Sequence, residues 1–203
     1  IMRRKRCTCA SPQAPRAGFA QFAALFAALD QTTKTSVKVA ALAAYFQAAP
    51  EADRVWTIAL LSGRRPKRAV TSTQLRDWAA ERAGVPLWLF EDAYAVAGDL
   101  AETIALILPQ PEDRFALEQG TASVPGGQAA RHRDLADWLA EIRRLPARDL
   151  ADRRAFVEAA WETAEAAERL VFNKLLTGGF RLGVSQKLIT RALASATGMA
   201  EPD

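Results

Sequence analysis

The chain has 203 residues, half of them hydrophobic and a quarter charged, with a formal net charge of +4. This balance is typical of a globular protein that buries a sizeable core, in one large domain or two small ones. The sequence contains no run of 18 apolar residues, which excludes an ordinary transmembrane helix, so we expect no membrane partner.

Residues 1–18 hold the whole basic excess of the chain. They contain five of the 27 Lys and Arg and no acid, which leaves 22 bases against 23 acids in the remainder. The segment lacks apolar periodicity, and Ile1 precedes Met2, so we expect a disordered or vector-derived arm. Its Cys7 and Cys9 are the only cysteines. Without further ligands they give a weak metal signal, and we expect free thiols in a reducing compartment.

Helical periodicity begins at Phe19 and continues almost without interruption. A first apolar stripe has 3-4-3 spacing and consists of Phe19, Phe22, Phe26 and Leu29. After a break at residues 31–35, the next helix is expected to turn five side chains inward: Val37, Ala41, Leu42, Tyr45 and Phe46. A third helix starts at Pro50, and its residues 55–61 are apolar all round, which predicts a central, buried helix.

Capping signals define the next three helices. Thr71 with Gln74 forms a predicted capping box for a helix that buries Leu75, Trp78 and Ala79. Gly84 ends that helix, and the following one, residues 86–97, is closed by Gly98. Asp99 and Glu102 then open a sixth helix, to Leu108. At a helix start these two carboxylates are better explained as N-cap and third-residue groups than as an acid/base pair or metal ligands.

Residues 109–130 form the only long irregular stretch and predict a connection between two helical lobes, at about 19–108 and 131–200. The second lobe carries three amphipathic stripes: Leu135, Trp138, Leu139, Ile142 and Leu145; Phe156, Val157, Ala160, Trp161 and Ala164; Leu188, Ile189, Ala192, Leu193 and Ala196. No strand-like alternation is present. We therefore predict an all-α domain over 19–203, with about ten helices in two packed lobes.

The residue types argue against catalysis by this chain alone. His132 is the only histidine, which excludes histidine-based triads and zinc sites with several histidines. The sequence contains neither a phosphate-loop motif nor a dinucleotide-binding motif. We expect no catalytic residue, no metal site and no cofactor in this chain.

The segment 172–194, FNKLLTGGFRLGVSQKLITRALA, joins the last two predicted helices through a glycine-rich turn. Gly178, Gly179 and Gly183 free the backbone for close approach, and Ser185 is a good N-cap. Arg181 lies within the turn, with Lys174 before it and Lys187 after it. This combination is suited to gripping a phosphate. The same pattern is also an ordinary connection between two helices.

Three stretches of the chain contain bases and no acid. They are residues 31–50 with Lys34 and Lys38; residues 54–76 with Arg54, Arg64, Arg65, Lys67, Arg68 and Arg76; and residues 169–200 with Arg169, Lys174, Arg181, Lys187 and Arg191. If they fold onto one face, binding to a phosphate backbone is the natural use. The alternative is a set of separate solvated patches.

Four segments resemble the N-terminal DNA-binding domain of ATP-dependent DNA ligases, particularly those of bacteria. They are FAALFAALDQTTKTSVKVAALAAYF, WTIALLSGRRPKRAV, AGVPLWLFEDAYAVAGDLAETIALIL and the glycine-turn segment given above, together spanning about 19–198. The most specific pieces are Gly98–Glu102 and Gly178–Ser185. The resemblance implies an all-helical domain that binds nicked double-stranded DNA through its backbone, in replication or repair, in the bacterial cytoplasm near the nucleoid.

By position, the resemblance and the basic stretches give one set of DNA-binding candidates: Thr33, Lys34, Arg64, Arg65, Lys67, Arg68, Lys174, Gly178, Gly179, Arg181, Gly183, Ser185 and Lys187. Ligases of this family use ATP and Mg²⁺ and carry an adenylated lysine in a Lys-x-Asp-Gly motif, followed by a nucleotidyltransferase core and an OB-fold. No lysine of this chain has that context. We therefore expect an isolated or truncated DNA-binding piece, inactive alone, whose partners are DNA and those remaining domains.

Two other functions remain open on the sequence. A helical protein–protein scaffold requires an exposed apolar groove with few charges. A helix-turn-helix regulator requires base-reading side chains at the start of a recognition helix. The helix after Ser185 offers only Gln186 and Lys187 there, so the regulator is the least favoured interpretation.

Overall fold

The computed structural model describes residues 18–109, 133–180 and 182–199. Within them it contains ten α-helices, one 3₁₀ helix and no strand, which confirms the all-α prediction. The helices are α1 (Phe19–Asp30), α2 (Thr35–Ala48), α3 (Glu51–Leu61), α4 (Ser72–Ala83), α5 (Leu87–Ala97), α6 (Leu100–Ile107), α8 (Leu135–Arg144), η2 (Leu145–Ala147), α9 (Leu150–Thr163), α10 (Ala166–Thr177) and α11 (Gln186–Thr197).

The predicted helix caps are present. Both hydrogen bonds of the capping box at α4 form, at 3.2 Å from the Gln74 N–H to Thr71 Oγ1 and at 2.9 Å from the Thr71 N–H to Gln74 Oε1. Asp99 accepts the N–H of Glu102 at 3.1 Å at the start of α6. Gly84 and Gly98 close α4 and α5 in the left-handed conformation, which glycine adopts without steric cost.

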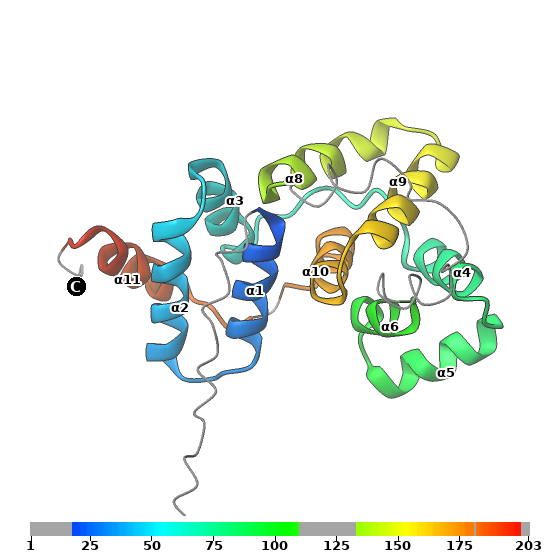
Figure 1. Ribbon diagram of the computed structural model, residues 1–203, viewed down its shortest axis with the longest axis horizontal. Coiled ribbons are helices and arrows are strands. Elements are labelled where there is room, and N and C mark those ends of the chain that lie inside the picture. Colours follow the sequence, from blue (N-terminus) through cyan, green and yellow to red (C-terminus); the bar gives the residue numbers. More distant parts are fainter. Residues whose placement is uncertain (1–17, 110–132, 181, 200–203) are drawn as a thin grey trace, which may run out of the picture.

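Helices that are distant in sequence pack together along an elongated body (Figure 1). Helix α11 packs on α2 at one end, α1 lies between α2 and α10, and α10 packs on α6 towards the other end, where α4, α5 and α6 contact one another. These contacts cross the predicted boundary between residues 19–108 and 131–200. Most of the predicted connection, 110–130, lies outside the described residues.

Aromatic side chains fill the centre of the body. Phe172 of α10 contacts Trp138 of α8, with ring centroids 5.1 Å apart, and Phe19 of α1 lies 5.8 Å from the same indole. The predicted stripes of α1 and α8 are fully buried, as expected from their spacing. This core fixes α1, α8 and α10 relative to one another.

Two predictions about buried faces are wrong. Helix α3 is peripheral rather than central: Val55 is 60% exposed, and the helix buries only Asp53, Thr57 and Leu60. It packs mainly against α8, so only one side of its apolar run is covered. Val37 is 46% exposed in the first turn of α2, and the neighbouring Lys38 is buried instead. A run of apolar residues shows what a helix is able to bury, but not where its partner lies.

None of the described helices combines the length and the apolar character needed to cross a bilayer.

Candidate nucleic-acid interface

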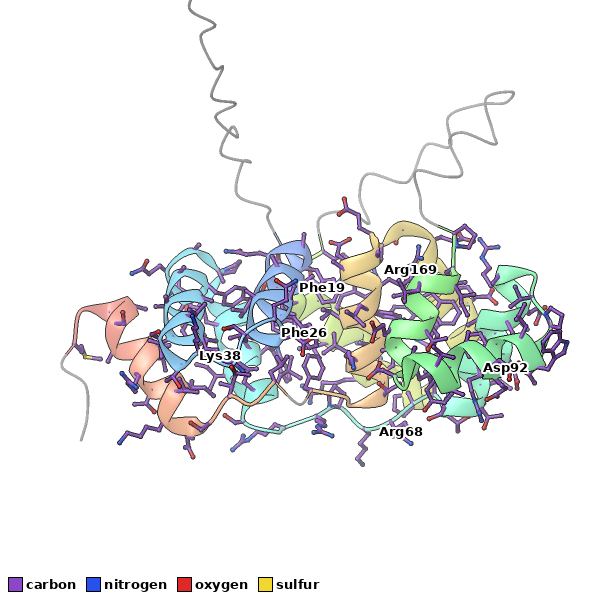
Figure 2. All side chains as sticks on the ribbon, turned by 90° about the horizontal axis from the view of Figure 1, so that it is seen from below. Phe19, Phe26, Lys38, Arg68, Asp92 and Arg169 are labelled. Carbon is purple, nitrogen blue, oxygen red and sulfur yellow. The ribbon has the colours of Figure 1, made fainter. Side chains whose placement is uncertain are left out.

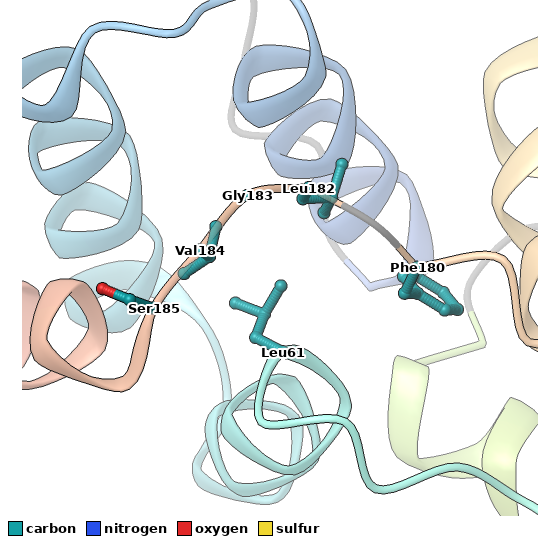
Figure 3. Close-up of a pocket in the computed structure, with 6 residues that line it drawn as sticks. All are labelled: Leu61, Phe180, Leu182, Gly183, Val184 and Ser185. Carbon is teal, nitrogen blue, oxygen red and sulfur yellow. The ribbon is translucent and has the colours of Figure 1, made fainter.

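Two basic segments that are more than 100 residues apart lie side by side in the structure. We call residues 62–71, between α3 and α4, the basic loop, and residues 177–185, from the last residue of α10 to the N-cap of α11, the glycine turn. Arg68 Nη2 donates a hydrogen bond to the Thr177 carbonyl at 3.3 Å. Leu61, just before the basic loop, lines a hollow of about 340 Å³ together with Phe180 and residues 182–185 of the turn (Figure 3).

The glycines of the turn occupy positions where a side chain would be strained or crowded. Gly178 has φ +80°, and a Cβ there would lie 3.3 Å from Cδ of Arg65. Gly179 has an ordinary φ, but its Cβ would meet the Lys174 side chain at 3.0 Å. Gly183 has φ +59°, in the left-handed region. The turn therefore needs glycine for its own geometry, whatever binds to it.

Most of the predicted contact residues are exposed. Arg64, Arg65, Lys67 and Arg68 project from the basic loop, and Figure 2 shows this loop along the lower edge of the molecule with Arg68 labelled on it. Within the described ranges, none of these four side chains makes an ion pair with an acid. Their charges are therefore available to a ligand.

The remaining predicted residues are distributed differently. Ser185 caps α11 by accepting the Leu188 N–H at 3.3 Å, and Lys187 is exposed in the first turn of that helix. Thr33 and Lys34 are exposed just before α2, and among the described residues no hydrogen bond or ion pair joins them to the glycine turn. Arg181 lies outside the described residues.

Lys174 is engaged within the protein. Its ammonium donates to Asp99 Oδ2 at the start of α6, and its side chain is only 13% exposed. Burial raises the pKa of Asp99, but the hydrogen bonds from Lys174 and from the Glu102 N–H outweigh it, so the pKa lies below its ordinary value. Sequence reasoning placed Asp99 as an N-cap and gave no sign of its second partner, 75 residues away.

Several other bases of the acid-free stretches are also engaged by groups of the protein, although only some of them are buried. Arg76 pairs with Glu91 at 2.8 Å, and Arg54 Nε donates to the Ala49 carbonyl at 2.7 Å. Lys38, 7% exposed, donates to the Leu182 carbonyl, and Arg169, 1% exposed, donates to four carbonyls. The exposed basic surface is therefore smaller than the sequence count suggests, and it is centred on the basic loop.

A second hollow, of about 610 Å³, lies where α6, α10 and the basic loop meet. Its lining mixes bases and acids: Arg65, Arg68 and Lys174 with Asp30, Asp99 and Glu102. Among the described residues, no group of three or more potential metal-ligating side chains is present.

A comparison with protein families shows the family to which the chain belongs. The family model described as DNA ligase N terminus matches residues 18–194, from the start of α1 into α11. The chain belongs to this family. No curated protein matches it. The expected resemblance is thereby confirmed, and the basic loop and the glycine turn are parts of a DNA ligase N-terminal domain.

Proposed function

We propose that this ligase N-terminal domain binds nicked double-stranded DNA without sequence preference, through the phosphate backbone, as the DNA-binding part of an ATP-dependent DNA ligase. The observation that carries the proposal is the meeting of the basic loop with the glycine turn. Four exposed bases, none of which forms an ion pair with an acid among the described residues, lie beside this turn, in which Gly183 is exposed.

The chemistry of these groups suits backbone contacts rather than base reading. Arg and Lys side chains from a loop neutralise phosphates, and the N–H groups at the start of a helix such as α11 also favour an anion. Contacts of this kind set the position and orientation of a protein on a duplex and carry no sequence information. We infer that positioning a nick is the task of this domain.

The remaining parts of a ligase complete the proposal. No lysine of this chain stands in a Lys-x-Asp-Gly context. ATP and Mg²⁺ are therefore assigned to the nucleotidyltransferase and OB-fold domains of the parent enzyme, which are the proposed protein partners. In this proposal the helical domain binds DNA and the other domains carry out the joining reaction.

One observation favours a second function, that of a protein-binding scaffold. Helix α5 exposes four large apolar side chains: Leu87, Trp88, Leu89 and Val96. Trp88 is 66% exposed. A Trp88→Ser variant distinguishes the two functions. We expect its affinity for duplex DNA to be unchanged, because α5 contributes nothing to the basic loop or the glycine turn.

A salt titration tests the proposed function. Fluorescence anisotropy of labelled nicked duplexes of unrelated sequences should give similar affinities that fall linearly on a log–log plot against salt, with a slope of about −3 to −6 for a handful of phosphate contacts. Arg64→Ala/Lys67→Ala should make the slope shallower by about two units. A matched control is Arg82→Ala/Arg133→Ala, which removes two charges at positions outside the basic loop and should leave the slope nearly unchanged.

Two results would contradict the proposal. One is an affinity that does not change between low and physiological salt, because phosphate neutralisation always releases counterions. The other is an equal loss of slope in both double variants, because the basic loop then has no special part in binding.

A further inference from the structure

The two lysines nearest to the glycines of the turn point inward and not to the solvent. We propose that Lys174 and Lys38 are positioning residues, whose ammonium groups fix the two ends of the glycine turn from inside the protein and do not bind phosphate. The inference rests on the proposed function, since it assigns roles within the same DNA-binding site.

The first end of the turn is fixed by Lys174. Its ammonium is held by Asp99, the N-cap of α6, so that the end of α10 is tied to the start of α6. The alkyl part of the same side chain lies against Gly179, where a Cβ would meet Lys174 Cδ at 3.0 Å. One side chain therefore joins two helices and also supports the backbone of the turn.

The second end is fixed by Lys38. This residue is 7% exposed on α2, and its ammonium donates to the Leu182 carbonyl. Gly183, the next residue, has φ +59°, and a Cβ on it would lie 3.5 Å from Lys38 Nζ. No acid within the described residues forms an ion pair with Lys38, and its ammonium donates to the turn itself. Figure 2 shows Lys38 among the helices, away from the lower edge where Arg68 lies.

Between the two lysines, the turn is also held by an aromatic contact. The ring of Phe180 packs edge-on against Phe26 of α1, at 5.6 Å between centroids, and lies 6.3 Å from Phe22. Leu182 is buried as well. The described residues of the turn are therefore already supported before DNA arrives. A site that is formed in advance loses less conformational entropy on binding.

The variant Asp99→Asn tests the role of Lys174, because a positioning role and a phosphate-binding role predict opposite changes in DNA affinity. Asn keeps the cap of α6, because its side-chain oxygen also accepts an N–H, but it releases the ammonium of Lys174. If Lys174 bound phosphate, its release would strengthen DNA binding. We expect binding to weaken instead, by about two- to fivefold, the size of one partly exposed ion pair.

Lys174→Met completes this test. It should also weaken binding, and the double variant Asp99→Asn/Lys174→Met should be no weaker than Lys174→Met alone, because both changes remove the same interaction. The matched control for Asp99→Asn is Glu91→Gln, which removes the acid from the Arg76 ion pair between α4 and α5 and, like Asp99→Asn, takes away one negative charge. Tighter or unchanged binding in Asp99→Asn overturns the assignment of Lys174.

Amide hydrogen exchange of the DNA-free protein separates the inference from the proposed function. Peptides covering residues 174–185 should exchange faster in Asp99→Asn and Lys174→Met than in the unaltered chain and in Glu91→Gln. If the unaltered chain binds no duplex DNA, the proposed function fails and the inference with it, whatever the exchange shows. If the unaltered chain binds while exchange and affinity stay the same in the variants, only the inference fails.

Lys38→Met tests the other end of the turn by comparing the change in DNA affinity with the change in melting temperature. Replacing this buried ammonium by an apolar side chain of similar length removes the cost of desolvating a charge, but it also leaves the Leu182 carbonyl without its donor, so the two effects on stability oppose each other. We therefore expect a melting temperature that changes little, faster exchange at residues 182–185, and binding weaker by about two- to fivefold. A purely structural lysine would lower the melting temperature without changing the affinity of the folded protein, and that result overturns the assignment of Lys38.

Discussion

Arg169 is almost completely buried although it carries a permanent charge. Its guanidinium donates hydrogen bonds to the carbonyls of Leu108, Pro109, Trp161 and Ala164, at 2.9–3.3 Å, and so satisfies the ends of α6 and α9. Carbonyls at a helix end lack partners within the helix. The side chain therefore replaces the cap that these two helices would otherwise need.

We predict that Arg169→Met lowers the free energy of unfolding by about 3 kcal/mol, because several buried carbonyls lose their donors at once. Urea denaturation measures this loss. Arg144→Met is the control, since that side chain is 69% exposed and its removal should change stability by less than about 0.5 kcal/mol. Equal, small losses in both variants would show that the buried network contributes little.

The sequence could not separate these internal bases from surface ones. Arg169, Lys174 and Lys38 lie in stretches without acids, and such stretches predict a solvated basic face. The acid that engages Lys174 is 75 residues away, and the partners of the other two are backbone carbonyls, which every residue type provides. By contrast, the basic loop contains Gly63 and Pro66 and little apolar sequence, and its exposure could be predicted locally.

At the scale of elements, local signals predicted the helices well and their partners poorly. The caps at Thr71, Asp99 and Ser185 depend on residues three positions apart, so they can be recognised in the sequence. Which helices meet depends on the whole chain. For this reason the peripheral position of α3 and the pairing of α2 with α11 were not foreseen.

The junction of α6 with α10 should depend on pH. Because the pKa of Asp99 is lower in the folded protein than its ordinary 3.8, its ionised form stabilises the fold. This contribution is fully present above pH 3.8 and is lost as the pH falls through the lowered value. The difference in unfolding free energy between the unaltered chain and Asp99→Asn should therefore shrink below pH 3.8, as measured by urea titrations at about pH 6 and about pH 2.5.

Asp53 provides a comparison, because its pKa is shifted in the opposite direction to that of Asp99. It accepts the N–H groups of Leu135 and Ala136 at the start of α8, and burial raises its pKa in spite of these bonds. Its pH-linked contribution is present below the ordinary pKa and is lost as the pH rises through the raised value. If Asp53→Asn and Asp99→Asn changed the pH dependence in the same direction, the account of the α6–α10 junction would be wrong.

For the whole molecule, net charge is a poor guide to where DNA binds. Residues 1–17 carry five bases and no acid, and without them the chain has 22 bases and 23 acids. The proposed interface depends instead on the local gathering of bases at the basic loop, within a body of slightly negative net charge. A local field is sufficient, because salt screens charges beyond about 10 Å.

We therefore predict that residues 18–203 keep salt-dependent binding to duplex DNA. The affinity of this shortened chain at low salt should be lower than that of the full chain, because the five bases of residues 1–17 add a non-specific attraction to DNA. Arg64→Ala/Lys67→Ala should still make the salt slope shallower by about two units in this shortened chain. Anisotropy titrations of both lengths provide the comparison, and complete loss of binding on removal of the arm would place the interface there.

The packing of α11 on α2 also determines when the domain is able to finish folding during synthesis. The end of α2 leaves the ribosome 138 residues ahead of the start of α11, which covers it. At 5–20 residues per second, the apolar side of α2 waits about 7–28 s for its partner. During that interval the N-terminal helices present an uncovered surface, and contacts of such long sequence separation form slowly even when the chain is complete. Nascent chains that end before residue 186 should therefore require chaperones to stay unaggregated.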